Sequence, residues 1–129
     1  MKLINLINAR GVITGCAREK IPAQTAYKFF NLLKSTDKDE AFYNEKRREI
    51  IDRYAKKDDD GNFVVDGGGI ALVPGTAATC KKELEELDNT IIEMPVRFTI
   101  EEFSGLCLSM ADILAIEGLL LEKEDENGS

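Results

Sequence analysis

A run of apolar residues at helical spacing between residues 22 and 57 constrains the fold more than any other feature of this chain. Pro22 suits the first turn of a helix, where its missing N–H costs no hydrogen bond. Apolar side chains then recur at steps of three and four residues as far as Tyr54. Ser35-Thr36-Asp37 interrupts this pattern, and Thr36 is placed to cap a restart. We therefore expect a long helix over about 22–57, with a bend near Thr36 left open.

A shorter helix is expected ahead of the long one. Apolar residues from Leu3 to Cys16 lie roughly at helical spacing and predict a first helix over about 3–19, which completes an αα-hairpin. Gly11 and Gly15 weaken this helix by about 1 kcal/mol each relative to Ala. Because they are four residues apart, the two glycines share one face. There they either let another helix approach closely or permit a bend.

Turn signals dominate residues 58–75. Asp60-Gly61 precedes the apolar residues 63–65, and Gly67-Gly68-Gly69 precedes the apolar residues 70–73. This order of turn, short apolar run, glycine turn and second apolar run predicts a small β-hairpin.

A further helix and a strand are expected between residues 76 and 98. Thr76 or Thr79 can cap a helix that runs to about Leu87. Residues 91–98 then alternate between apolar and polar, as a half-buried strand does, and Pro95 confines that strand to an edge or a bulge.

The C-terminal part opens two helical segments with capping boxes. Thr99 with Glu102 begins a short turn that Gly105 ends, and Ser109 with Asp112 begins an apolar helix over about 110–121. Residues 122–129 are polar and acidic, and we expect them to form a flexible tail. The whole predicts an α+β fold in a single domain over 1–121. Its parts are an N-terminal αα-hairpin with a long second helix, a small antiparallel β element and a C-terminal helix.

Charge is divided unequally along the chain. Residues 1–57 carry 13 Lys and Arg against 7 Asp and Glu, a net of +6, whereas residues 58–129 carry 4 against 17, a net of −13. Such polarity favours contact with other molecules through the surface. Direct nucleic-acid binding is disfavoured, because the overall charge of −7 repels phosphate and acidic residues interleave the basic ones after position 36. Part of the division is expected to dock the two halves of the fold onto each other.

Little in the sequence points to catalysis or to a cofactor. Histidine is absent, which removes the usual general base near pH 7 and the commonest metal ligand. The turn at Asp58-Asp59-Asp60-Gly61 has the spacing of part of an EF-hand loop. Lys56 and Gly67, however, stand where its first and last ligands are needed, so a solvated turn is expected. We expect no catalytic residue, no metal and no cofactor.

Cysteine usage and hydropathy indicate a cytosolic, soluble protein in a reducing compartment. The cysteines are Cys16, Cys80 and Cys107. They form no closely spaced pair, and each is expected to act as a small buried apolar residue. No apolar run approaches the length of a membrane span, so no membrane contact is expected.

A candidate interaction surface consists of charged residues on two of the expected helices. On the helix that ends near Leu87, Glu83, Glu85 and Glu86 are expected to face outward, and Arg47 and Arg48 on the long helix complete the surface. A solvated surface is favoured for the glutamates over an acid–base pair. Such a face can also present carboxylates to a basic, nucleic-acid-binding partner.

The order of features resembles a family of small proteins of unknown function encoded in tailed-phage and prophage genomes, which are described as tail-related structural proteins. The resemblance is carried by Lys20-Ile21-Pro22-Ala23 at the start of a long helix, by residues 45–54, by the turn at 58–62 and by residues 103–109 before a last apolar helix. The glycine-rich residues 66–75 depart from the family pattern. The resemblance implies a phage context and carries over no site residue.

Three function classes follow from these observations. The leading hypothesis is a non-enzymatic phage protein that acts by protein–protein contact in virion or tail assembly, in the cytoplasm of the bacterial host or associated with the virion. The second is an acidic inhibitor of a host defence enzyme or nucleic-acid enzyme. The third is a small enzyme that uses carboxylates. Homo-oligomerisation is left open, because the apolar helix over 110–121 suits a core position and a dimer seam equally.

Overall fold

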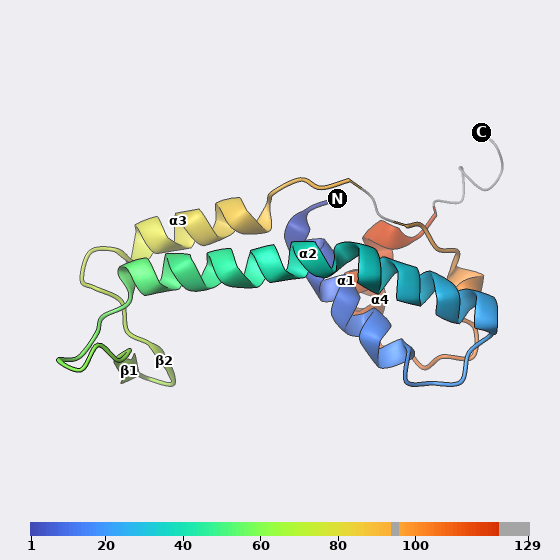
Figure 1. Cartoon of the computed structure of the whole chain (residues 1–129), viewed down its shortest axis with the longest axis horizontal. Helices are drawn as coiled ribbons and strands as arrows, with labels where there is room; N and C mark the ends of the chain where they lie inside the picture. Colours follow the sequence, from blue (N-terminus) through green and yellow to red (C-terminus); the bar gives the residue numbers. More distant parts are fainter. Residues whose placement is uncertain (94–95, 122–129) are drawn as a thin grey trace.

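Helix α2 is the longest element of the fold, and α1 and α3 pack against it (Figure 1). The computed structural model describes residues 1–93 and 96–121, and the tail expected over 122–129 lies outside them. The elements in chain order are α1 Leu3–Cys16, α2 Ala23–Tyr54, β1 Val65–Asp66, β2 Gly69–Ile70, α3 Ala77–Asp88, η1 Ile100–Phe103, α4 Met110–Ile116 and η2 Glu117–Leu119. The expected α+β fold is confirmed, with a long second helix, a small antiparallel β element and a C-terminal helix.

Helix α2 runs without a break through the segment where a restart was open. The expectation that Thr36 caps a second helix is wrong, because Thr36 is buried and its hydroxyl donates to the Leu32 carbonyl oxygen one turn earlier, at 2.6 Å. That bond satisfies the hydroxyl inside the helix, so the polar residue does not interrupt the backbone ladder.

A buried arginine joins α1 to α2. Arg10 is 6% exposed, and its Nη1 donates to the Leu33 carbonyl oxygen at 2.7 Å and to Thr36 Oγ1 at 2.6 Å. Its Nη2 and Nε reach Asp37 and Glu40 at 2.8 and 3.0 Å. Burial opposes the charged form, but the hydrogen bonds to Glu40 and Asp37 outweigh it and raise the pKa of the guanidinium. The helix pair is therefore held by a satisfied buried charge as well as by apolar packing.

One core cluster lies where α1, α2 and the C-terminal segments meet. Phe29 of α2, Phe98 and Phe103 form a triangle of rings with centroids 5.4 to 5.7 Å apart. Leu6 and Ile13 of α1 are fully buried against the same cluster. Such tilted aromatic contacts add to the stabilisation from burial.

A second cluster joins α2 to α3, which lie side by side in Figure 1. Tyr43 of α2 is buried and donates its hydroxyl to Asp88 Oδ1 at 2.6 Å. Burial, followed by the hydrogen bond to Asp88, raises the pKa of the Tyr43 phenol to about 12. Leu87 is buried in this cluster and Leu84 packs against it, so the expected inward face of α3 is confirmed.

The β-hairpin lies at the C-terminal end of α2, away from α1 and α4 (Figure 1). Val65 pairs with Ile70 and Asp66 with Gly69 across a turn at Gly67 and Gly68. Both turn glycines have positive φ, +60° and +84°, which a two-residue turn of type I′ requires. The expected hairpin is confirmed, but its strands are Val65–Asp66 and Gly69–Ile70, so most of the apolar runs 63–65 and 70–73 lie outside them.

The strand expected over 91–98 is wrong for its described residues. Ile91 forms a single antiparallel bridge to Lys2, and Phe98 forms a single parallel bridge to Leu120. The two ends of this segment thus pair with different parts of the chain, and among residues 91–93 and 96–98 no ladder extends from either bridge. The expected edge position of Pro95 lies outside the described residues.

Both predicted capping boxes are present, at Thr99 with Glu102 and at Ser109 with Asp112. The last helix is shorter than expected, since α4 ends at Ile116 and a 3-10 turn follows. That turn carries Leu120 to its bridge with Phe98, which a straight helix through residue 121 does not do.

Ion pairs among the described residues cross the charge boundary of the sequence. Lys28 pairs with Glu102 and Arg53 with Glu83, at 2.8 and 2.7 Å. These contacts confirm that part of the charge division docks one half of the fold on the other. None of the helices within the described ranges has both the length and the apolar character that crossing a membrane demands.

Candidate binding groove along α1

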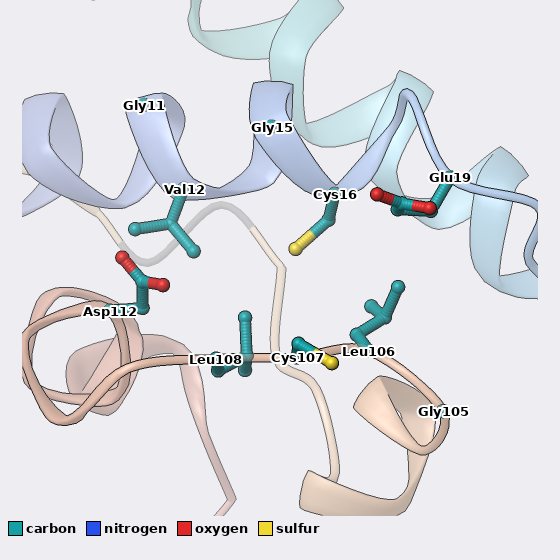
Figure 2. Close-up of a pocket in the computed structure, with 10 residues that line it drawn as sticks. All are labelled: Gly11, Val12, Gly15, Cys16, Glu19, Gly105, Leu106, Cys107, Leu108 and Asp112. Carbon is teal, nitrogen blue, oxygen red and sulfur yellow. The ribbon is translucent and has the colours of Figure 1, made fainter.

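A cavity of about 320 Å³ separates α1 from the segment that follows η1 (Figure 2). Val12 and Cys16 point into it from α1, and Leu106, Cys107 and Leu108 line the opposite wall. Asp112 and Glu19 stand at opposite ends of the view in Figure 2. The cavity walls therefore combine apolar side chains with two carboxylates.

The two glycines of α1 leave this space open. A Cβ placed on Gly11 or on Gly15 meets no atom within 4 Å, and both glycines line the cavity. The expectation that they admit a second helix is wrong, because no such contact occupies their face. The two glycines are four residues apart and therefore share one face of α1, and this spacing is the sequence signal that marks the cavity.

Two local backbone structures position the cavity wall that faces α1. Gly105 ends η1 with φ +85°, a left-handed conformation that glycine adopts without strain. The capping box then orients Asp112, since Ser109 Oγ accepts from the Asp112 N–H at 3.1 Å and Asp112 Oδ2 accepts from the Ser109 N–H at 3.0 Å. The carboxylate is held at the start of α4 while it lines the cavity.

A second hollow of about 420 Å³ continues along α1 toward its N-terminus. Asn5 and Asn8 line it from α1, and Ala111, Leu114 and Ala115 line it from α4. Both hollows share Val12 and Asp112, so they form one depression, here called the α1 groove.

Large apolar side chains at the start of α4 stand open to solvent beside this groove. Met110 is 80% exposed and Leu114 is 64% exposed. By contrast, Ile116 and Leu119 lie in the core. The apolar segment therefore divides its residues between the core and an exposed face, and this exposed face adjoins the groove at Leu114.

The cysteines differ in their surroundings. Cys16 and Cys80 are buried, as expected, but the expectation for Cys107 is wrong because this residue is exposed. Its neighbours Leu106 and Leu108 pack against the core, and the residue between them is turned outward. Burial raises the pKa of the Cys16 thiol, and the negative charges of Asp112 and Glu19 raise it further.

The predicted interaction residues differ in their exposure. Glu85, Glu86, Arg47 and Arg48 are exposed. Glu83, expected to face outward, instead faces α2 and pairs with Arg53 at 2.7 Å. The reason is its spacing, because Glu83 lies three residues after buried Cys80 and four before buried Leu87.

In the acidic turn at residues 58–62, a side-chain carboxylate accepts hydrogen bonds from backbone N–H groups of the same turn. Asp58 Oδ1 accepts from the N–H groups of Asp60 and Asn62 at 2.9 and 3.0 Å. Within residues 1–93 and 96–121, no group of three or more His, Cys, Asp and Glu side chains is arranged to hold a metal ion.

Comparisons with protein-family models, with curated proteins and with solved structures each gave no match. The resemblance to phage-encoded proteins therefore stays a prediction from the sequence.

Proposed function

We propose that this chain is a non-enzymatic protein of a tailed phage or prophage that acts by binding another protein during virion or tail assembly. Its place of action is the cytoplasm of the bacterial host and, after assembly, the particle. The order of sequence motifs supports the phage context. The observation that carries the binding role is the open α1 groove, which no described part of the chain fills.

The groove has the make-up of a protein-binding surface. Its walls combine apolar side chains with carboxylates, and exposed Met110 and Leu114 stand on or beside its rim. Exposed apolar groups rimmed by polar ones mark interaction sites on soluble proteins. The rest of the fold supports such a role, because Arg10 and the aromatic cluster hold α1 and hence one wall of the groove.

The alternative of an acidic inhibitor rests on the outer face of α3. Two carboxylates of the expected three, those of Glu85 and Glu86, are exposed, while Glu83 is engaged by Arg53. The groove lies along α1 and is lined by none of these residues. The two proposals therefore predict different sensitive surfaces.

A complementation experiment separates them. The gene is deleted from the phage or lysogen that encodes it, and infectious particle yield is measured after supplying wild type, Gly15→Leu or Ala17→Leu. Gly15→Leu fills the groove, whereas Ala17→Leu adds the same side chain at an exposed site on the same chain segment that does not line the groove. We expect wild type and Ala17→Leu to restore the yield and Gly15→Leu to fail.

Full restoration by Gly15→Leu, together with failure of Glu85→Lys and Glu86→Lys, contradicts the proposal and favours the acidic inhibitor. An unchanged yield after deletion of the gene refutes the assembly role itself.

A further inference from the structure

The carboxylates of the α1 groove differ from the paired carboxylates elsewhere in the fold. Asp37, Glu40, Glu83 and Glu102 each have a cationic partner. Among residues 1–93 and 96–121, neither Glu19 nor Asp112 forms an ion pair, although both line the cavity. The groove thus carries two carboxylates that have no cationic partner among the described residues, although Asp112 accepts the Ser109 N–H.

Among the described residues, no basic side chain lines either hollow. The charged lining residues are Glu19 and Asp112, and the remaining polar ones are Asn5, Asn8 and Cys107 with the buried thiol of Cys16. The fields of both carboxylates reach Cys16, since each contributes to raising its pKa. The electrostatic potential at the cavity wall between the two carboxylates is therefore negative.

The floor of the groove can accept a slender side chain. Gly11 and Gly15 have no atom within 4 Å of a Cβ position, and Val12 gives an apolar surface beside them. A Lys or Arg side chain has an unbranched methylene stem that packs on apolar surface and a charged head that seeks carboxylates. The cavity volume of about 320 Å³ is ample for one such side chain.

We propose that the occupant of the α1 groove is a basic segment of a partner protein, with a Lys or Arg side chain placed between Glu19 and Asp112 and flanking apolar residues against Met110 and Leu114. This inference rests on the proposed function and names the chemistry of the partner. Charge complementarity selects this occupant over an acidic or a neutral segment.

A defined peptide tests the inference with the full chain. The probe is the acetylated, amidated heptapeptide Ser-Gly-Leu-Lys-Leu-Gly-Ser, and the matched peptides carry norleucine or glutamate in place of lysine. Binding is followed by amide chemical-shift changes in a two-dimensional ¹⁵N spectrum. We expect the lysine peptide to shift the resonances of Gly11, Gly15 and Asp112, with an affinity about tenfold tighter than that of the norleucine peptide.

Variants link the effect to the groove. Glu19→Gln is expected to weaken binding of the lysine peptide by about threefold and to bring it closer to the norleucine peptide. Glu85→Gln removes an exposed carboxylate elsewhere and is expected to change nothing. Gly15→Leu is expected to abolish binding while the protein stays folded, because Leu has a higher helix propensity than Gly.

Four results overturn the inference. Equal affinity of the lysine and norleucine peptides refutes the proposal of a basic occupant, and so does the absence of lysine-peptide binding at millimolar concentration. Shifts spread over the outer face of α3 show general attraction to an acidic protein. Groove shifts that follow protein concentration without peptide, and that Gly15→Leu removes, identify a second copy as the occupant.

The inference and the proposed function fail separately. If Gly15→Leu blocks particle assembly but the lysine peptide has no preference for the groove, the assembly role stands and the basic occupant is wrong. If the peptide binds as expected but Gly15→Leu restores particles fully, the basic-segment site stands and the assembly role is wrong.

Discussion

Replacement of Arg10 by methionine tests the account of how α1 is held. Methionine keeps an unbranched apolar stem of similar reach but removes every hydrogen-bond donor of the guanidinium. Four acceptors lose a partner: the Leu33 carbonyl oxygen, Thr36 Oγ1, Asp37 Oδ1 and Glu40 Oε2.

The expected loss follows from the exposure of each acceptor. The side chains of Asp37 and Glu40 are 70% and 41% exposed, so water replaces the arginine there and each pair contributes about 0.5 kcal/mol. Thr36 is buried and the Leu33 bond is partly buried, so each of these bonds contributes about 1 kcal/mol. Arg10→Met should therefore lower the free energy of unfolding by about 3 kcal/mol, and Asp37→Asn by about 0.5 kcal/mol.

Urea unfolding followed by circular dichroism at the helix band measures both values. Arg48→Met is the matched control, because Arg48 is an exposed arginine on α2, and its expected effect is below about 0.5 kcal/mol. The reasoning is refuted if Arg10→Met unfolds at the same urea concentration as Arg48→Met. It is also refuted if Asp37→Asn costs as much as Arg10→Met, since the buried bonds would then contribute nothing.

Three further predictions concern ionisation and backbone conformation. Burial opposes the charge on Glu102, but hydrogen bonding to Lys28 outweighs burial and lowers the pKa of the carboxyl. The stability that this carboxylate contributes to the fold is therefore present above its unfolded pKa and is lost as pH falls through its folded pKa. Glu102→Gln should flatten the acid limb of stability below about pH 5, as measured by urea midpoints across pH. The Tyr43 phenol, with its pKa raised to about 12, contributes stability that is complete below the unfolded pKa near 10 and disappears as pH rises through the folded value. Tyr43→Phe should remove an absorbance step near pH 12 and cost about 1 kcal/mol. The reasoning is contradicted if the variant keeps the step near pH 12 and instead loses absorbance change near pH 10. Gly15→Ala should stabilise the protein by about 1 kcal/mol because nothing crowds the new Cβ, whereas Gly68→Ala, at φ +84°, should destabilise it by about 1 kcal/mol; equal signs in thermal melts would contradict the backbone argument.

Local patterns in the sequence carry much of the fold. The helical spacing of residues 22–54 and the two capping boxes specify elements that form from neighbouring residues alone, and these predictions are confirmed. The alternation over 91–98 failed because a strand also needs a partner, and here each end of the segment meets a different one.

Features that depend on contacts far apart in the sequence were missed. Arg10 lies at the spacing of buried residues, four after Leu6 and three before Ile13. A charged side chain is ordinarily exposed, so this spacing alone does not predict its burial. Arg10 is buried because Thr36 and its neighbours on α2 supply hydrogen-bond acceptors. The α1 groove requires residues 5–19 to meet residues 105–115, and no local pattern encodes that meeting. The shared face of Gly11 and Gly15 marked one wall without indicating what lies opposite.

The central claim, that another protein covers the α1 groove, is tested most directly by the reactivity of Cys107. Cys107 is exposed and is one of the residues that line the groove, whereas Cys16 and Cys80 are buried and serve as internal references. Alkylation by N-ethylmaleimide, read by mass spectrometry, is compared between the free protein and the protein within assembled particles. The account predicts rapid modification of Cys107 in the free protein and strong protection in the particle. Equal modification rates in the two states would contradict it.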